Sequence, residues 1–228
     1  MFIKKSKMRI LYQKLLSPFS RKVRMVLDEK GLEYHTINKD SPYDRDEIFS
    51  LDPSGELPVL MEHEGNIIPY HHAICEYIDE MFERPSLMGR ISETRAEVRR
   101  LCHWFDDKLY NDVVRYLLSE KVYKRLGNRS PNSKYIALAR KNLDMHMEYI
   151  SVLAEKYEFL AGDFLSMADI CAVAQMSVLD YIGEVKWDNL RETKEWYMKI
   201  KSRKSFKSIL SERVRGILPP AHYSNLDF

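Results

Sequence analysis

The segment that most constrains the fold is Ser17-Pro18-Phe19-Ser20, which lies between an apolar run and a helical pattern. Residues 8–12 form the short apolar run, and apolar residues then recur at helical spacing from Val23 until Gly31, a residue type common just after a helix end. Leu57-Pro58 follows Ser17-Pro18 after forty residues. We therefore expect a strand, a tight loop and a helix, followed later by an X-Pro bond of the kind that can be cis.

The residues that follow complete the pattern of a small mixed sheet. Alternating apolar and polar residues predict a strand over residues 34–37, and two short apolar runs predict a hairpin from 59–61 and 66–68. A short helix is expected near 48–49 and a longer one over 71–82. The order strand-helix-strand, then strand-strand-helix, resembles the thioredoxin fold. In that fold a cis X-Pro bond precedes the third strand, which is the position of Leu57-Pro58.

Ser17 occupies the position where a redox enzyme of this plan carries a cysteine. A serine hydroxyl can donate a hydrogen bond to a bound thiolate, but it cannot form a disulfide. Ser17 therefore excludes disulfide exchange, but it is compatible with chemistry like that of a glutathione transferase. A serine before a helix is also a common cap or turn residue, so both interpretations of Ser17 remain open.

Composition limits the class of protein. The chain has 228 residues, 45% hydrophobic and 31% charged, which is typical of a globular protein with a large core. A net charge of +2 argues against a nucleic-acid binder. Since no apolar run approaches the ~20 residues of a membrane span and the start lacks a signal-peptide pattern, we expect a cytoplasmic protein with no membrane insertion.

Cys75, Cys102 and Cys171 are expected to be buried free thiols.

A change of pattern near Pro85 and Gly89 predicts two domains. The sequence indicates an α/β domain at 1–84, a linker at 85–90, an all-helical domain at 91–218 and a C-terminal interaction tail at 219–228. Ser92 is expected to cap the first long helix of the second domain.

Ser166 and Asp169 are predicted to form a capping box at the start of a helix. Residues 170–179 are apolar nearly all round, so this helix is expected to be central. Phe159-Leu160-Ala161-Gly162-Asp163 stands directly upstream. With this motif the chain resembles the glutathione-transferase superfamily across both domains, which implies a thioredoxin-like domain followed by an all-helical domain.

Four segments narrow the resemblance further. The chain is similar to the FtsZ-localized protein A family, which are glutathione-transferase-like division proteins of alphaproteobacteria. The similarity is carried by residues 104–108, 177–183, 196–203 and the terminal 219–228. The resemblance implies a homodimer that binds FtsZ filaments in cell division, needs no glutathione, and uses its tail to signal to wall synthesis.

The expected glutathione site departs from the superfamily pattern. The resemblance implies a Glu-Ser pair that opens the last helix of the first domain, shortly before Ala-Ile, and holds the γ-glutamyl group. Ala73-Ile74 is present, but the aligned pair is Tyr70-His71. We expect weak glutathione binding, no required cofactor and a non-catalytic adaptor.

The alternative is an active glutathione transferase in which Ser17 stabilises the thiolate. The glutathione would then be bordered by Leu57, Pro58, Tyr70 and His71. A pocket for the electrophile would face residues 103–104. A glutathione-dependent isomerase or dehalogenase would share this site.

The remaining candidates concern metals and partners. Adjacent helical residues diverge, and no third ligand is spaced with His71-His72, so no metal is expected. Arg21 and Arg24, with Lys22, form one basic cluster, and a second runs from Lys199 to Lys207; either is a solvated face or meets an acidic protein. The tail is expected to dock, onto a partner or onto the protein itself, through Tyr223, Leu226, Asp227 and Phe228.

Overall fold

The structure is a computed structural model that describes residues 8–188 and 190–226. It divides into two compact units, with the boundary between Ser86 and Leu87. The boundary falls inside the predicted linker. The expected fold class is confirmed: a four-stranded sheet with helices in the first unit and a helical second unit.

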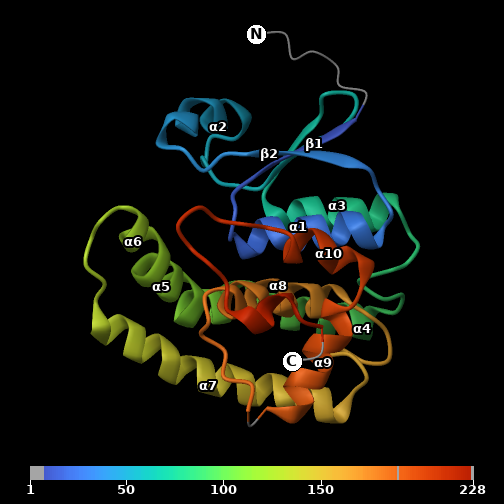
Figure 1. Ribbon diagram of the computed structural model, residues 1–228. Helices are drawn as coiled ribbons and strands as arrows, with labels where there is room; N and C mark the ends of the chain where they lie inside the picture. Colours follow the sequence, from blue (N-terminus) through green and yellow to red (C-terminus); the bar gives the residue numbers. More distant parts are fainter. Residues whose placement is uncertain (1–7, 189, 227–228) are drawn as a thin grey trace. The chain divides into compact units, whose positions relative to one another are not determined.

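The first unit follows the predicted order of elements. They are β1 (Arg9–Gln13), α1 (Pro18–Glu29), β2 (Tyr34–Asn38), η1 (Pro42–Asp44), α2 (Arg45–Leu51), β3 (Val59–Met61), β4 (Ile67–Pro69) and α3 (His71–Met81). The sheet order is β2-β1-β3-β4, with β1 parallel to β2 and the other pairs antiparallel. Helices α1 and α3 lie side by side against the sheet (Figure 1).

Local chemistry explains the bounds of α1. The side chain of Ser17 caps the helix and Pro18, whose ring favours helical φ, is its first residue. The chain leaves the helix through Gly31 at φ 65°, where glycine has no Cβ penalty. The apolar face of α1, including Val23 and Val26, is fully buried.

The second unit contains helices and short helical turns. Its elements are α4 (Ser92–His103), η2 (Trp104–Val114), α5 (Arg115–Leu118), η3 (Ser119–Tyr123), α6 (Lys124–Leu126), α7 (Ser133–Lys156), α8 (Met167–Tyr181), α9 (Arg191–Lys201), η4 (Lys204–Phe206), α10 (Lys207–Leu210) and η5 (Ala221–Ser224). Elements α4 to α6 follow one another without a break, and η2 and η3 within them are π-helical. Ser92 is the first residue of α4 and Ile91 is the cap, so the expected role of Ser92 was wrong.

Helix α8 is the centre of the second unit, as predicted, because all its residues are buried. The capping box is confirmed: the backbone N–H of Ser166 donates to Asp169 Oδ2 at 2.9 Å and the Ser166 hydroxyl donates to the same atom at 2.7 Å. All three cysteines are free and buried, as expected. Within the described residues, every helix is too short or too polar to cross a membrane.

The start of the second unit is packed rather than loose. Leu87 and Met88, which the sequence placed in a linker, are buried at 0% and 3% exposure. The backbone N–H of Met167 donates to the carbonyl of Leu87 at 2.7 Å. This segment therefore belongs to the core around the start of α8.

Candidate functional site

Three turns of the first unit meet at one end of the sheet. Tyr12 of β1 pairs with Val59 of β3, and Val59 pairs with Pro69 of β4, in antiparallel register. The loop after β1, the residues before β3 and the residues after β4 therefore share one edge. These positions carry Ser17, Leu57-Pro58 and Tyr70-His71, so the structure places the predicted site residues at the same end of the sheet.

Ser17 is a helix cap. Its hydroxyl oxygen accepts from the backbone N–H of Ser20 at 3.3 Å, and the residue is 9% exposed. Leu16 just before it has a positive φ of 56°, which turns the chain sharply into α1. Capping uses an acceptor lone pair and leaves the hydroxyl proton available for donation. The capping interpretation is confirmed, and a donor role is compatible with it.

The second turn has the predicted peptide geometry. The Leu57-Pro58 bond is cis, and Pro58 is buried at the start of β3. A second cis bond joins Arg84 to Pro85 near the end of the first unit.

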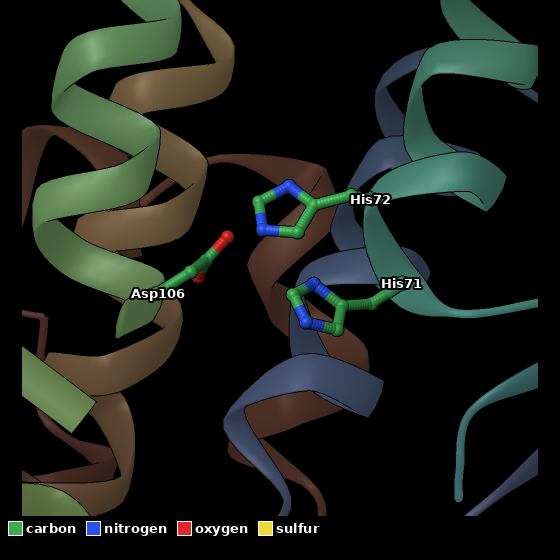
Figure 2. A group of neighbouring side chains, drawn as sticks. All are labelled: His71, His72 and Asp106. Atoms are coloured by element: carbon green, nitrogen blue, oxygen red, sulfur yellow. The ribbon is translucent and has the colours of Figure 1, made fainter. Parts of the chain in front are cut away.

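The third turn differs most from the superfamily pattern. Tyr70 precedes α3 at φ 70°, makes no capping side-chain bond and is 54% exposed. His71 is 8% exposed and stacks on Phe19 of α1, with ring centroids 4.2 Å apart. Figure 2 shows the rings of His71 and His72 extending from the start of α3. The turn thus presents aromatic rings where the resemblance implied a carboxylate.

A lysine of α1 reaches both rings. Lys22 Nζ lies 3.4 Å from Nδ1 of His71 and 3.4 Å from Nδ1 of His72. A protonated lysine only donates, and with Lys22 in that form each Nδ1 acts as the acceptor. Lys22 of α1 therefore lies against the start of α3.

The first basic cluster is not a surface. Arg21, Lys22 and Arg24 are 0%, 1% and 6% exposed. Both interpretations of Arg21 and Arg24, a solvated face and a contact for an acidic protein, required exposed side chains, and their burial contradicts both. The positively charged side chains of Lys199, Arg203, Lys204 and Lys207 in the second cluster are exposed.

The C-terminal segment is mostly part of the fold. Tyr223 is fully buried, and its ring lies edge-on to Tyr181 with centroids 5.1 Å apart. Of the two docking modes that the sequence left open for Tyr223, the structure shows docking onto the protein itself, so Tyr223 is not available as the partner-binding residue that it was predicted to be. Leu226 is 42% exposed, and Asp227 and Phe228 lie outside the described residues.

A buried polar cluster holds this segment, and the sequence analysis missed it. Asp180, fully buried near the end of α8, accepts from Tyr197 Oη at 3.1 Å and pairs with His222 Nε2 at 2.9 Å. Lys201 Nζ lies 3.6 Å from the same carboxylate; burial lowers the pKa of Lys201, and Asp180 opposes that shift. The sequence does contain one signal for this cluster. Asp180 is a carboxylate within an otherwise apolar helix, and a buried charge requires partners.

The expected electrophile pocket was placed beside His103 and Trp104. In the structure Trp104 packs against Tyr149, with centroids 4.5 Å apart, and His103 is exposed. A cavity of about 400 Å³ lies elsewhere in the second unit, between α7 and the segment after α8. Its lining combines the charged side chains of Arg140, Lys186 and Glu184 with the apolar side chains of Leu143, Met147 and Val185.

Asp106, also drawn in Figure 2, is a buried acceptor within the second unit. It accepts from the Cys171 thiol at 3.2 Å and from Gln175 Nε2 at 3.5 Å. Cys171 was expected to be a packing residue only, and its hydrogen bond adds to that role.

Comparisons with known proteins agree with this geometry. Residues 16–81 match the glutathione S-transferase N-terminal domain and residues 116–204 the C-terminal domain. The chain is 42% identical to FtsZ-localized protein A of Caulobacter vibrioides, over 96% of this chain and 98% of that protein.

Two solved structures are similar over nearly the whole chain. A structure titled FzlA from C. crescentus superposes with a TM-score of 0.94 at 42% identity, covering 97% of this chain and 100% of that one. A glutathione S-transferase from Rhodospirillum rubrum superposes with a TM-score of 0.94 at 43% identity, with coverage of 97% and 100%. The chain belongs to the glutathione S-transferase superfamily, in the group of FtsZ-localized protein A.

Proposed function

We propose that this protein is a non-catalytic adaptor of the bacterial cytoplasm that binds FtsZ filaments during cell division. The observation that carries the proposal is the start of α3, where Tyr70 and His71 stand in place of the Glu-Ser pair and supply no carboxylate. The similarity to FtsZ-localized protein A supports FtsZ as the partner.

The magnitude of the missing interaction favours weak glutathione binding. A hydrogen bond to a charged group contributes roughly 1.5–3 kcal/mol, which corresponds to about a ten- to hundredfold change in affinity. Lys22 lies beside the same turn and, as a donor only, supplies no acceptor in place of the missing carboxylate. Glutathione is therefore at most a weak ligand, and no cofactor is required.

Co-sedimentation with FtsZ polymers tests the adaptor function. We expect the folded protein to pellet with FtsZ assembled from the same source, and to remain in the supernatant when nucleotide is withheld and FtsZ is unassembled. Absence from the pellet at low salt would contradict the proposal. Calorimetric titration with glutathione is the companion measurement, and micromolar affinity would favour an enzyme.

The alternative function is an active glutathione transferase, and the placement of Ser17 at the N-terminus of α1 favours it. That terminus offers backbone donors and a positive dipole end to a thiolate. Turnover of an aromatic electrophile that disappears in Ser17→Ala would establish this alternative. Under the adaptor proposal, turnover is negligible, and Tyr70→Glu with His71→Ser raises glutathione affinity.

A further inference from the structure

The cavity of about 400 Å³ in the second unit is lined from two sides. One wall is a stripe of α7 that carries Arg140, Leu143, Asp144 and Met147, which recur at the three- and four-residue spacing of one helix face. The other wall is the segment 183–186, directly after α8. Pockets that hold small ligands have volumes of about 300–1,000 Å³, so this cavity has room for a small organic molecule.

The second wall is held in place without a ligand. Gly183 follows α8 at a φ of 70°, and the backbone N–H of Glu184 donates to the carbonyl of Leu179 at 2.9 Å, which turns the chain sharply out of the helix. Arg140 then joins the two walls, because its Nε and Nη2 donate to the two carboxylate oxygens of Glu184 at 2.8 and 3.1 Å. A pocket with fixed walls loses little entropy when it binds a ligand.

Glu184 contributes no free charge to the cavity. Its side chain is buried and pairs with both Arg140 and Lys121. Burial raises the pKa of Glu184, but the hydrogen bonds from Arg140 and Lys121 outweigh that effect, so its pKa is lowered and the group is ionised at neutral pH. The carboxylate and the guanidinium thus neutralise each other, and a charged ligand has to find its counter-charges elsewhere in the lining.

Three exposed side chains of the lining supply such charges. They are Lys141, Asp144 and Lys186, and none of their charged groups has an ion-pair or hydrogen-bond partner among the residues that the structure describes. The lysines can donate to a carboxylate, and Asp144 can accept from an ammonium group. A purely anionic ligand would face Asp144, and a purely cationic one would face both lysines. A zwitterion meets a counter-charge at each.

The rest of the lining is apolar. Leu143, Met147 and Val185 are 4%, 3% and 7% exposed, and Leu190 is half-buried. An apolar group placed against these side chains removes water from both surfaces, which is favourable. The cavity therefore combines buried apolar surface with exposed charges of both signs.

We propose that this cavity binds a free α-amino acid with a large apolar side chain. The apolar side chain lies against the buried apolar residues, the α-carboxylate faces Lys141 and Lys186, and the α-ammonium group faces Asp144. An α-amino acid carries these three groups on a single carbon atom, which suits a cavity of this size. All the lining residues belong to the second unit, whereas the expected glutathione site belongs to the first. The inference does not depend on FtsZ binding.

Titration of the full chain with L-phenylalanine, followed by NMR of the backbone amides, tests the proposal. For a ligand of this size we expect a dissociation constant on the order of 1 mM, with shifts in residues 140–147 and 183–186. L-Alanine lacks the large apolar group and should bind about tenfold more weakly, or weaker still. The absence of saturable shifts up to about 20 mM phenylalanine, or shifts confined to other parts of the chain, would overturn the proposal.

A cycle of ligand and side-chain changes tests the contact with Asp144. 3-Phenylpropanoate lacks only the ammonium group, so the wild-type chain should bind it about threefold to tenfold more weakly than phenylalanine. In Asp144→Asn the two ligands should bind almost equally, because the ammonium group has lost its partner. Equal binding by the wild-type chain, or a difference that survives in the variant, would show that the site does not take a zwitterion.

The two lysines are tested through the carboxylate. Lys141→Gln with Lys186→Gln should weaken phenylalanine binding by about tenfold, whereas 2-phenylethylamine, which lacks the carboxylate, should lose no affinity. Lys134→Gln, at an exposed position of α7 outside the lining, is the matched control and should bind phenylalanine like the wild-type chain. Unchanged affinity in the double variant, or an equal loss in the control, would contradict the proposed contact.

Discussion

At the residue scale, Asp169 illustrates how a local motif acquires long-range contacts. Besides closing the capping box, Asp169 Oδ1 accepts from the backbone N–H of Leu160 at 2.8 Å and from Trp196 Nε1 at 2.9 Å. The sequence predicts only the cap. The carboxylate also joins the start of α8 to the segment before it and to α9.

These contacts make Asp169→Ala more costly than the loss of a cap. Removing a cap costs about 0.5–2 kcal/mol, but here several buried donors lose their acceptor, and each costs about 1–3 kcal/mol. We expect the free energy of unfolding to fall by about 3–5 kcal/mol, measured by urea denaturation. Asp169→Asn keeps one acceptor oxygen and should cost less; equal losses would show that the hydrogen bonds are not the cause.

Tyr223 gives a second prediction at this scale. Because the ring is fully buried, Tyr223→Ala should destabilise the chain by roughly 3–5 kcal/mol through the cavity it leaves. Leu226→Ala, three residues later and 42% exposed, is the matched control and should change stability little. Chemical denaturation of both variants makes the comparison. Near-wild-type stability of Tyr223→Ala would mean that the segment is not docked as the structure shows.

At the scale of elements, turn chemistry predicted the first unit well. The residue types at these turns restrict the backbone locally, so their effect can be predicted from the sequence. The examples are Ser17-Pro18, Gly31 and Leu57-Pro58. The burial of Arg21 and Arg24 was missed because a helical pattern shows which residues share a face but not what covers it. The cluster around Asp180 was missed for a similar reason, because its partners lie up to 42 residues away in the sequence, as the pair with His222 shows.

The contact between α7 and η2 predicts a pH dependence of stability. His146 is fully buried, pairs through Nε2 with Asp112 Oδ2 at 3.3 Å and lies edge-on to Trp104. Burial lowers the pKa of His146 below the ordinary histidine value; Asp112 opposes this shift and Lys108 adds to it. The folded state therefore binds the proton less readily than the unfolded chain, and stability is lost as pH falls below about 6.5.

Unfolding free energies measured at pH 7 and pH 5 test this contribution. The loss from one histidine is at most about 1.4 kcal/mol per pH unit. His146→Gln keeps a polar side chain without the titration and should show a smaller loss over the interval. Asp112 and Glu184, whose pKa values are lowered in the folded protein, contribute mainly at lower pH. Burial raises the pKa of Asp169, and that contribution is common to both proteins. Identical pH profiles for both proteins would contradict the assignment.

At the scale of the whole molecule, the distribution of charge matters more than its sum. The net charge is only +2, yet Lys204 and Lys207 are exposed within the second basic cluster while the first cluster is buried. Sequence alone did not distinguish the clusters, since both have similar composition. Of the two clusters, the second is the one whose charged side chains are mostly exposed.

If FtsZ binding is steered by this surface, Lys204→Glu with Lys207→Glu should weaken it. Reversing exposed charges at the rim of an interface mainly slows association and reduces salt dependence. We expect several-fold weaker co-sedimentation at low salt and a smaller difference from wild type at high salt, where screening is strong. Lys134→Glu with Lys186→Glu, two exposed lysines outside the cluster, controls for the same change in net charge. Equal weakening by the control would show that overall charge, not this surface, governs the interaction.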